Sequence, residues 1–227
     1  MYAENRSLTG MVRWGALASI LFLGLAVTSA PAHAGELYAG VGLGNAKMKD
    51  NRACGAARNL LNDGYSCTST DNTNHGLKLV GGYQLMDILG FELSYLNFGG
   101  TTANASGISK STSTSATAKT EFEAKGFAFA AVGTLPVTKD FGVIGRVGIF
   151  RWNVQSTASI PGGSSTLAKD TKPGFTFDNI GIGFKYGISK TMDMRVEWER
   201  FKDVGDTHIT GQGDIDLITL GLLFNFQ

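Results

Sequence analysis

Six charged residues stand out because they lie in segments that are otherwise apolar or rich in glycine: Lys78, Glu92, Arg146, Lys185, Arg195 and Glu197. An unpaired charge is strongly unfavourable inside a protein, so buried charges of both signs form ion pairs. We expect Glu92 and Glu197 to bridge the arginines and Lys185. Glu199 is also expected inside, nearer the end of its segment that leads into a loop. If such pairs can exchange partners, the same set could instead form a gated path for ions.

A second group of residues could support acid–base catalysis. Asp206 and His208 are separated by one residue, and Asp203 precedes them in the same polar segment. A histidine beside carboxylates can act as a general base, but no His-x-Ser pair accompanies this one. The sequence also lacks a phosphate-binding G-x-x-x-x-G-K-[ST] loop and a metal-binding H-E-x-x-H motif. We therefore expect no enzymatic activity, no cofactor and no metal site, and we treat His75 as an incidental histidine.

The N-terminal segment has the order of a secretory signal peptide. Arg6 and Arg13 precede an apolar run over 15–27, and small residues follow up to Ala32-His33-Ala34. The alternative is a membrane anchor, but about 13 apolar residues are fewer than the roughly 20 that span hydrocarbon. We predict a cleaved signal peptide over 1–34 and one mature domain over 35–227.

The predicted export affects the expected redox state of the two cysteines, Cys54 and Cys67, which lie in one polar stretch. Exported proteins favour disulfides, and a bridge here would close a loop of about 14 residues, worth roughly 3 kcal/mol in the chain-entropy model. A metal site is the alternative, but histidine partners are too few. We predict a disulfide between the two.

The composition of the mature chain excludes some partners and favours strands. Removing Arg6, Arg13 and Glu4 from 20 basic and 19 acidic residues leaves 18 of each, and this neutral balance gives no reason to expect nucleic acid. The whole chain has 31 glycines and 14 phenylalanines but only 4 prolines. Glycines and aromatic residues on short alternating segments are typical of β-strands.

Eight segments alternate in this way: 37–47, 76–84, 88–99, 122–135, 141–153, 175–189, 193–201 and 214–227. The connections between them are alternately long and short, with long polar segments at 48–75, 100–121, 154–174 and 202–213. Up-and-down barrels of the outer membrane have long extracellular loops and short periplasmic turns. We therefore predict an all-β fold, an eight-stranded antiparallel up-and-down transmembrane β-barrel. The segment 100–121 is so polar that we expect it to be mobile.

Alternation also separates two faces on each strand, because successive residues point to opposite sides. Ile180, Ile182 and Phe184 share a face, and Gly181 and Gly183 share the other. In a membrane barrel the apolar face meets lipid, whereas a soluble barrel buries it. Glycine on the polar face favours a crowded, narrow lumen and hence the membrane barrel. Segment 122–135 fits either orientation.

Aromatic residues near the predicted strand ends are expected to form girdles at the two surfaces of the bilayer. The residues concerned are Tyr38, Tyr83, Tyr95, Trp152, Tyr186, Trp198, Phe224 and Phe226.

In these segments the sequence resembles the transmembrane barrel of the outer membrane protein A family. The similar stretches are Gly90 to Tyr95, Gly145 to Gly148, Gly183 to Tyr186, Met194 to Trp198, and Gly205 to His208 leading into Leu220 to Phe226. The resemblance implies a luminal salt-bridge network, with Glu92, Arg146, Arg195 and Glu197 at the charged sites. Lys185 departs from the family pattern. The resemblance also implies a barrel without the peptidoglycan-binding domain of longer members, because the sequence ends at the eighth strand.

These observations favour an integral protein of the bacterial outer membrane with a structural or surface-interaction role. We expect a closed, salt-bridged lumen, loops outside the cell and a monomer in contact with outer-membrane lipid, including lipopolysaccharide. The expected contact surface for a partner is loops 48–75 and 100–121, with a helix-like stretch from Gly55 to Leu61. The alternatives are a narrow gated ion channel and a soluble periplasmic ligand-binding barrel.

Overall fold

A computed structural model describes residues 35–48, 57, 60–71, 73–159, 168–206 and 211–226. This part of the chain contains nine strands: β1 (Glu36–Met48), β2 (Ser66–Asp71), β3 (Thr73–Met86), β4 (Leu89–Ile108), β5 (Ser115–Pro136), β6 (Phe141–Ser159), β7 (Ala168–Ser189), β8 (Met192–Asp206) and β9 (Gly211–Phe226). None of the helices found among these residues is long and apolar enough to span a membrane.

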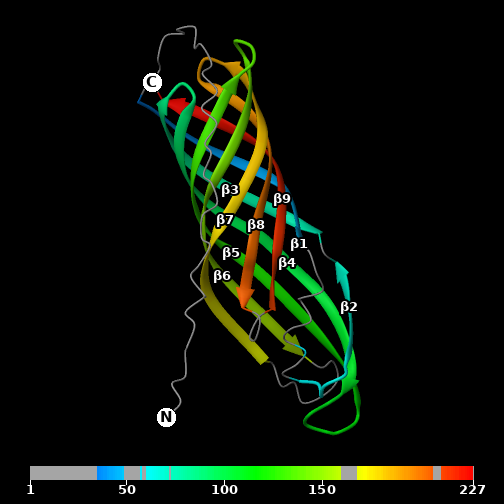
Figure 1. Ribbon diagram of the computed structural model, residues 1–227. Coiled ribbons are helices and arrows are strands. Elements are labelled where there is room, and N and C mark those ends of the chain that lie inside the picture. Colours follow the sequence, from blue (N-terminus) through cyan, green and yellow to red (C-terminus); the bar gives the residue numbers. More distant parts are fainter. Residues whose placement is uncertain are drawn as a thin grey trace, which may run out of the picture. The chain divides into compact units, whose positions relative to one another are not determined.

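Eight of the strands close into a barrel (Figure 1). Each strand pairs with its neighbour in an antiparallel ladder, and β1 pairs with β9 from Leu37 opposite Phe226 to Met48 opposite Ile215. This ladder joins the first strand to the last, so the barrel has no open edge along it. The short strand β2 lies outside the ring and pairs with the far half of β4. The predicted eight-stranded antiparallel barrel is confirmed.

The two ends of the barrel differ in their connections. Short turns join β3 to β4, β5 to β6 and β7 to β8 at the end where β9 finishes. We call this the turn end, and the opposite end, which carries the longer connections, the loop end. The three short turns were predicted correctly.

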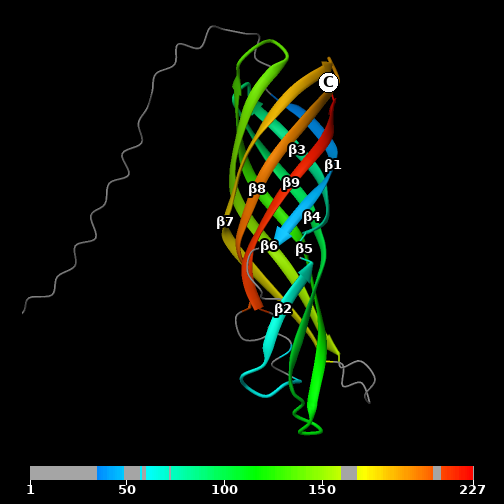
Figure 2. The ribbon, with the colours of Figure 1, turned by 90° about the vertical axis from the view of Figure 1, so that its right-hand side faces the viewer.

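At the loop end the strands run further than the sequence suggested. The segment 100–121, expected to be mobile, instead extends β4 and β5 into a long hairpin (Figure 2). Ala103 and Ala105 on one strand, and Ala118 and Thr120 on the other, are fully buried. Small side chains carry little hydrophobic signal, yet they alternate inward and outward with the period of a strand. The expectation of a mobile loop was therefore wrong.

Several strands, among them β1, β5 and β8, change the face on which their apolar residues lie. On the turn-end half of β5, Phe127 and Phe129 point outward, with 55% and 49% of their surface exposed, opposite buried Ala128 and Ala130. Beyond Phe127 the outward positions become charged and the inward ones apolar. Apolar residues on the outward face fit a part of the barrel that is surrounded by lipid. Apolar residues on the inward face fit a part of the barrel that is surrounded by water. The change settles the orientation of segment 122–135, which the sequence left open.

The inward apolar residues of the loop-end half form a core inside the barrel. Its centre is a trio of fully buried rings, Phe98, Phe150 and Phe201. Their centroids lie 5.6 Å apart between Phe98 and Phe150, 5.0 Å between Phe98 and Phe201, and 4.9 Å between Phe150 and Phe201. We call this trio the aromatic plug.

Two of the aromatic residues expected in the girdles point into the barrel. Tyr38 and Trp152 are buried, because each occupies an inward position of its strand. The other six lie on the outer surface, either exposed or partly exposed: Tyr83, Tyr95, Tyr186, Trp198, Phe224 and Phe226.

Candidate functional site

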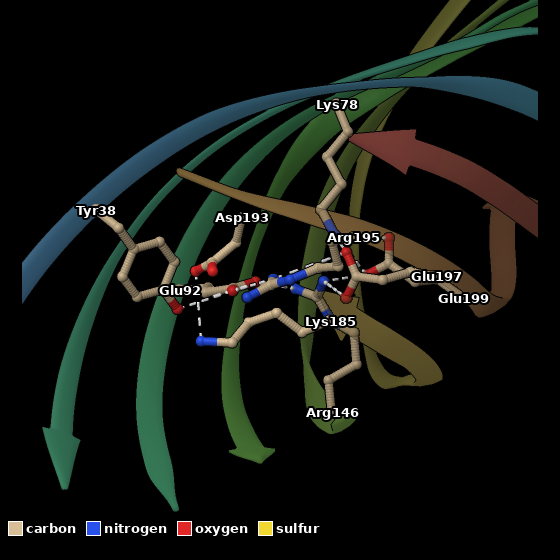
Figure 3. Close-up of polar contacts among 9 residues, drawn as sticks. All are labelled: Tyr38, Lys78, Glu92, Arg146, Lys185, Asp193, Arg195, Glu197 and Glu199. Carbon is tan, nitrogen blue, oxygen red and sulfur yellow. Dashed lines mark hydrogen bonds and ion pairs between the residues drawn. The ribbon is translucent and has the colours of Figure 1, made fainter. Parts of the chain in front are cut away.

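Charged side chains from four strands meet inside the turn-end half of the barrel (Figure 3). Lys78 comes from β3, Glu92 from β4 and Arg146 from β6. Strand β8 contributes alternate residues, Arg195, Glu197 and Glu199, which share a face because strand side chains alternate. We call these six residues the charged cluster.

Glycines on neighbouring strands make room for the long side chains of this site. A Cβ atom at Gly181 would lie 2.8 Å from Cδ of Arg146, and one at Gly183 would lie 2.9 Å from Cγ of Glu197. At Gly82 it would lie 2.2 Å from the ring of Tyr38. The recurrence of glycine on the polar face therefore has a steric reason in this lumen.

Arg146 lies at the centre of the cluster. Its Nη2 atom is 3.2 Å from Oε2 of Glu92, and its Nη1 atom is 3.2 Å from Oε1 of Glu197. The same guanidinium group also pairs with Glu199. On the other side, Lys78 Nζ donates to Glu197 at 2.7 Å and to both carboxylate oxygens of Glu199 at 3.1 Å. Arginine's planar set of donors suits this multiple pairing.

Glu92 connects the cluster to Arg195 and Tyr38. Arg195 Nη1 donates to Oε1 of Glu92 at 2.5 Å, and the Tyr38 hydroxyl donates to the same oxygen at 2.8 Å. The guanidinium carbon of Arg195 also lies 5.8 Å from the centroid of the Tyr38 ring, within the range of a cation–π contact.

The charged cluster is almost completely withdrawn from solvent and is balanced in charge. All six residues are buried, none with more than 6% of its surface exposed. Three cations face three carboxylates, so the formal charges sum to zero. Buried ions need such compensation, because removing one partner leaves an uncompensated charge in a poorly polarisable interior. The arrangement can hold the lumen closed through mutual pairing.

Lys185 lies apart from the charged cluster, although the sequence suggested that it would join it. Its ammonium group is 3.4 Å from Asp193 Oδ2 (Figure 3). Asn225 Nδ2 donates to the same oxygen at 3.0 Å. Lys185 is paired with Arg195 across the ladder and lies nearer the turn end than Glu197, and its ammonium group meets the carboxylate of Asp193 on the turn-end side of Arg195. Its side chain remains partly exposed.

Sequence reasoning missed one member of this site. Tyr38 was assigned to a girdle, although it is in phase with Gly40 and Gly42 on the inward face of β1. Strict counting of alternate residues would have found it. Glu199 was expected in the lumen, nearer the loop end and outside the proposed ion pairs, and it lies inward beside Arg146 as one of their partners.

The aromatic plug lies next to the charged cluster on the loop-end side. Phe150 follows Arg146 by four residues on β6, and Phe201 follows Glu199 by two on β8, so both are the next large inward side chains. The lumen therefore contains two successive layers, one ionic and one apolar.

The other residues singled out in the sequence are dispersed or lie outside the described residues. His208 and Cys54 fall outside them, as does most of the stretch from Gly55 to Leu61, so the disulfide stays a prediction. Cys67 is partly buried against the core residues of the loop end. Asp206 lies 3.8 Å from Lys172, and His75 is exposed. Among the described residues no group of three metal-binding side chains occurs.

The OmpA-like transmembrane domain model matches residues 32–227. The chain belongs to this family. Outer membrane protein A of Salmonella typhi is 27% identical over 195 residues, covering 83% of this chain and 48% of that protein. Its counterpart in Shigella flexneri is 27% identical over 158 residues, covering 69% of this chain and 42% of that protein. The chain thus spans about half the length of these relatives.

Solved structures support the same fold. The crystal structure of Ail, the attachment invasion locus protein of Yersinia pestis, aligns with a TM-score of 0.51 at 16% identity, covering 85% of this chain and 99% of Ail. Ail in complex with the heparin analogue sucrose octasulfate aligns with a TM-score of 0.50 at 15% identity. At this identity the likeness concerns the fold alone.

Family membership assigns the outward apolar residues to lipid. The protein is an integral β-barrel of the bacterial outer membrane, and the band of exposed residues such as Leu43, Phe127 and Leu220 is its contact with the bilayer. The predicted family resemblance and location are confirmed. Residues 1–34 lie outside the described residues, so the signal peptide stays a prediction.

Proposed function

We propose that this barrel is a non-enzymatic, monomeric membrane anchor with a closed lumen, and that its loop end faces outside the cell and contacts other surfaces. The single observation that carries the closed lumen is the succession of two filled layers inside the barrel. An ion crossing the lumen would have to separate the pairs of the charged cluster and then pass the aromatic plug.

The second layer matters because it is independent of the first. Exchange of ion-pair partners could open a polar path through the charged cluster. The aromatic plug contains no charges to rearrange, and its three rings are fully buried against one another. Opening it would require separating packed rings, which is unfavourable in a close-packed interior. Interconversion of ion pairs alone therefore leaves the lumen closed.

Conductance in planar bilayers tests the closed lumen. We expect folded protein to give no discrete current steps, and we expect Arg195→Gln to remain silent because the aromatic plug is intact. A gated channel, the alternative function, predicts steps whose size changes when Glu92 or Arg195 is neutralised. Steps of that kind from protein shown to be folded would contradict the proposal.

The surface role is supported by the structured loop end. The long hairpin of β4 and β5, with β2 along its side, encloses a small core of its own, in which Leu61 and Ala105 are fully buried. A connection that served only to join two strands would need no such core. The fixed shape of this surface suits recognition by a partner outside the cell.

Shortening the hairpin tests this role without disturbing the membrane barrel. Asn104 and Lys119 are direct partners in the ladder, so an Asn-Gly turn can replace residues 105–118 between them. We expect the shortened protein to reach the outer membrane in normal amount. Cells producing it should adhere to surfaces, or to one another, no more than cells that lack the protein. Adhesion equal to that of cells with the full-length hairpin would argue against a surface role for this segment.

A further inference from the structure

Basic residues surround the barrel where the apolar band ends on the loop-end side, and several of them already have acidic partners. Arg200 donates to Asp216 through Nε at 2.6 Å and Nη2 at 3.0 Å. Lys202 Nζ lies 3.2 Å from Asp178, and further out, in the hairpin, Lys119 Nζ lies 3.0 Å from Glu121. These cations are neutralised within the protein.

Lys125 on β5 and Arg151 on β6 differ from the others. Both side chains are exposed on the outer surface, and neither has an ion pair among the described residues. The nearest outward carboxylate on their strands is Glu123, two residues before Lys125 on β5 and nearer the loop end. With Glu123 included, this patch still carries one net positive charge.

The position of the two cations is fixed by the ladder. Lys125 is the next outward residue after Phe127, and Arg151 is the next after Ile149, so both follow directly on the lipid-facing residues. Phe127 is the direct partner of Arg151, which places the two cations diagonally across neighbouring strands. Side chains that follow directly on a hydrocarbon-facing position lie at the level of lipid headgroups.

Two amides complete a row of donors. Lys125 is the direct partner of Asn97 on β4 and of Asn153 on β6, so three outward polar side chains lie side by side, roughly 5 Å apart. Asn97 Oδ1 accepts a hydrogen bond from the Gly99 backbone N–H at 3.0 Å. This bond fixes the amide with its Nδ2 group free to donate.

We propose that Lys125, Arg151, Asn97 and Asn153 bind a phosphate group of a membrane lipid at the outer surface of β4, β5 and β6. The arginine supplies a planar pair of donors, the lysine a point charge and the amides neutral donors, a set that matches the oxygens of a phosphate. The site adjoins the established lipid contact, and its charge is opposite to that of the ligand. It requires neither a closed lumen nor a surface partner.

Native mass spectrometry of the folded protein in phosphatidylcholine nanodiscs tests the site, with bisphosphorylated lipid A as the probe. We expect the double variant Lys125→Gln, Arg151→Gln to bind lipid A about thirtyfold more weakly than the unaltered protein, because each of the two basic residues near an anionic surface contributes roughly 1 kcal/mol. The matched control Lys119→Gln, Lys202→Gln removes the same charge from residues with acidic partners. It should bind within about twofold of the unaltered protein.

Measurements with two other lipids separate the contribution of the phosphate to binding from that of the acyl chains, and they identify the kind of lipid that supplies the phosphate. Dephosphorylated lipid A should show no difference between the two double variants. Phosphatidylglycerol in place of lipid A distinguishes a phospholipid headgroup from lipopolysaccharide. With either lipid, weaker binding by the Lys125→Gln, Arg151→Gln variant than by the control variant supports the site.

The conservative variant Lys125→Arg, Arg151→Lys should retain binding. Equal weakening by both double variants, or equal binding by all, would overturn the proposal, provided that each variant shows the heat-dependent gel shift of a folded barrel.

Discussion

At the scale of single residues, Glu92 joins three partners in the lumen. Its carboxylate pairs with Arg146 and Arg195 and accepts the Tyr38 hydroxyl, while only 1% of the residue is exposed. We expect Glu92→Gln to lower the free energy of unfolding by about 3–5 kcal/mol, since it leaves a buried positive charge without compensation. Urea unfolding in lipid vesicles, followed by tryptophan fluorescence, measures this difference.

The control for that experiment is Lys119→Gln at the exposed pair with Glu121, whose side chains are about half exposed. Such pairs contribute about 0.2–1 kcal/mol. If the two variants lose the same amount of stability, the charged cluster is not the stabilising unit that its burial implies.

Alternation along a strand predicts which face a residue occupies, but not which strands meet across the lumen. This is why inward positions could be assigned to Lys78, Glu92 and Arg146 from sequence, whereas Lys185 was grouped with the wrong partners. Lys185 is inward too, yet the stagger of the ladder places it beside Asp193. The stagger of a closed barrel depends on all eight strands together, so it cannot be read from one of them.

At the scale of elements, the seam between β1 and β9 depends on a close approach of two backbones. A Cβ atom at Gly44 would lie 1.7 Å from the carbonyl oxygen of Ile218. We expect Gly44→Ala to destabilise the barrel by about 3 kcal/mol or to prevent its closure, because the backbone oxygen cannot move away without breaking the ladder. The fraction of protein that shows a heat-dependent shift on a gel reports closure.

Gly81→Ala on β3 is the matched control, because a Cβ atom there would have no neighbour within 4 Å. It should change stability by less than about 0.5 kcal/mol. A similar loss of folded protein in both variants would show that any alanine in these glycine-rich strands is harmful, and that the seam has no special role.

The eight strands were predictable because aliphatic and aromatic residues mark them with period two. Their extensions at the loop end were not, since alanine, serine and threonine between Thr101 and Thr120 alternate without a large difference in hydrophobicity. The aromatic plug was missed for a related reason. Phe98 and Phe150 fall where the apolar face switches sides, and a pattern that assumes one lipid-facing side assigns them wrongly.

At the scale of the whole molecule, a ring of hydrogen-bonded strands with a filled lumen should resist detergent. We expect the protein in the outer-membrane fraction to migrate differently on a denaturing gel before and after boiling, because only heat opens the closed ladder between β1 and β9. A soluble periplasmic band without a shift would be incompatible with the lipid-facing band described here.

The switch in apolar face also fixes how deep the barrel lies in the membrane. Sinking by two residues along the strands, about 7 Å of strand length, would carry Lys125 and Arg151 into hydrocarbon, where a basic residue costs up to about 2–4 kcal/mol at the midplane. Rising by the same amount would move Phe127 out of the hydrocarbon to the present level of Lys125. Opposing forces therefore hold the barrel at one level. The height of the hairpin tip above the bilayer is accordingly set by strand length, and a bilayer of different thickness would have to deform around the barrel.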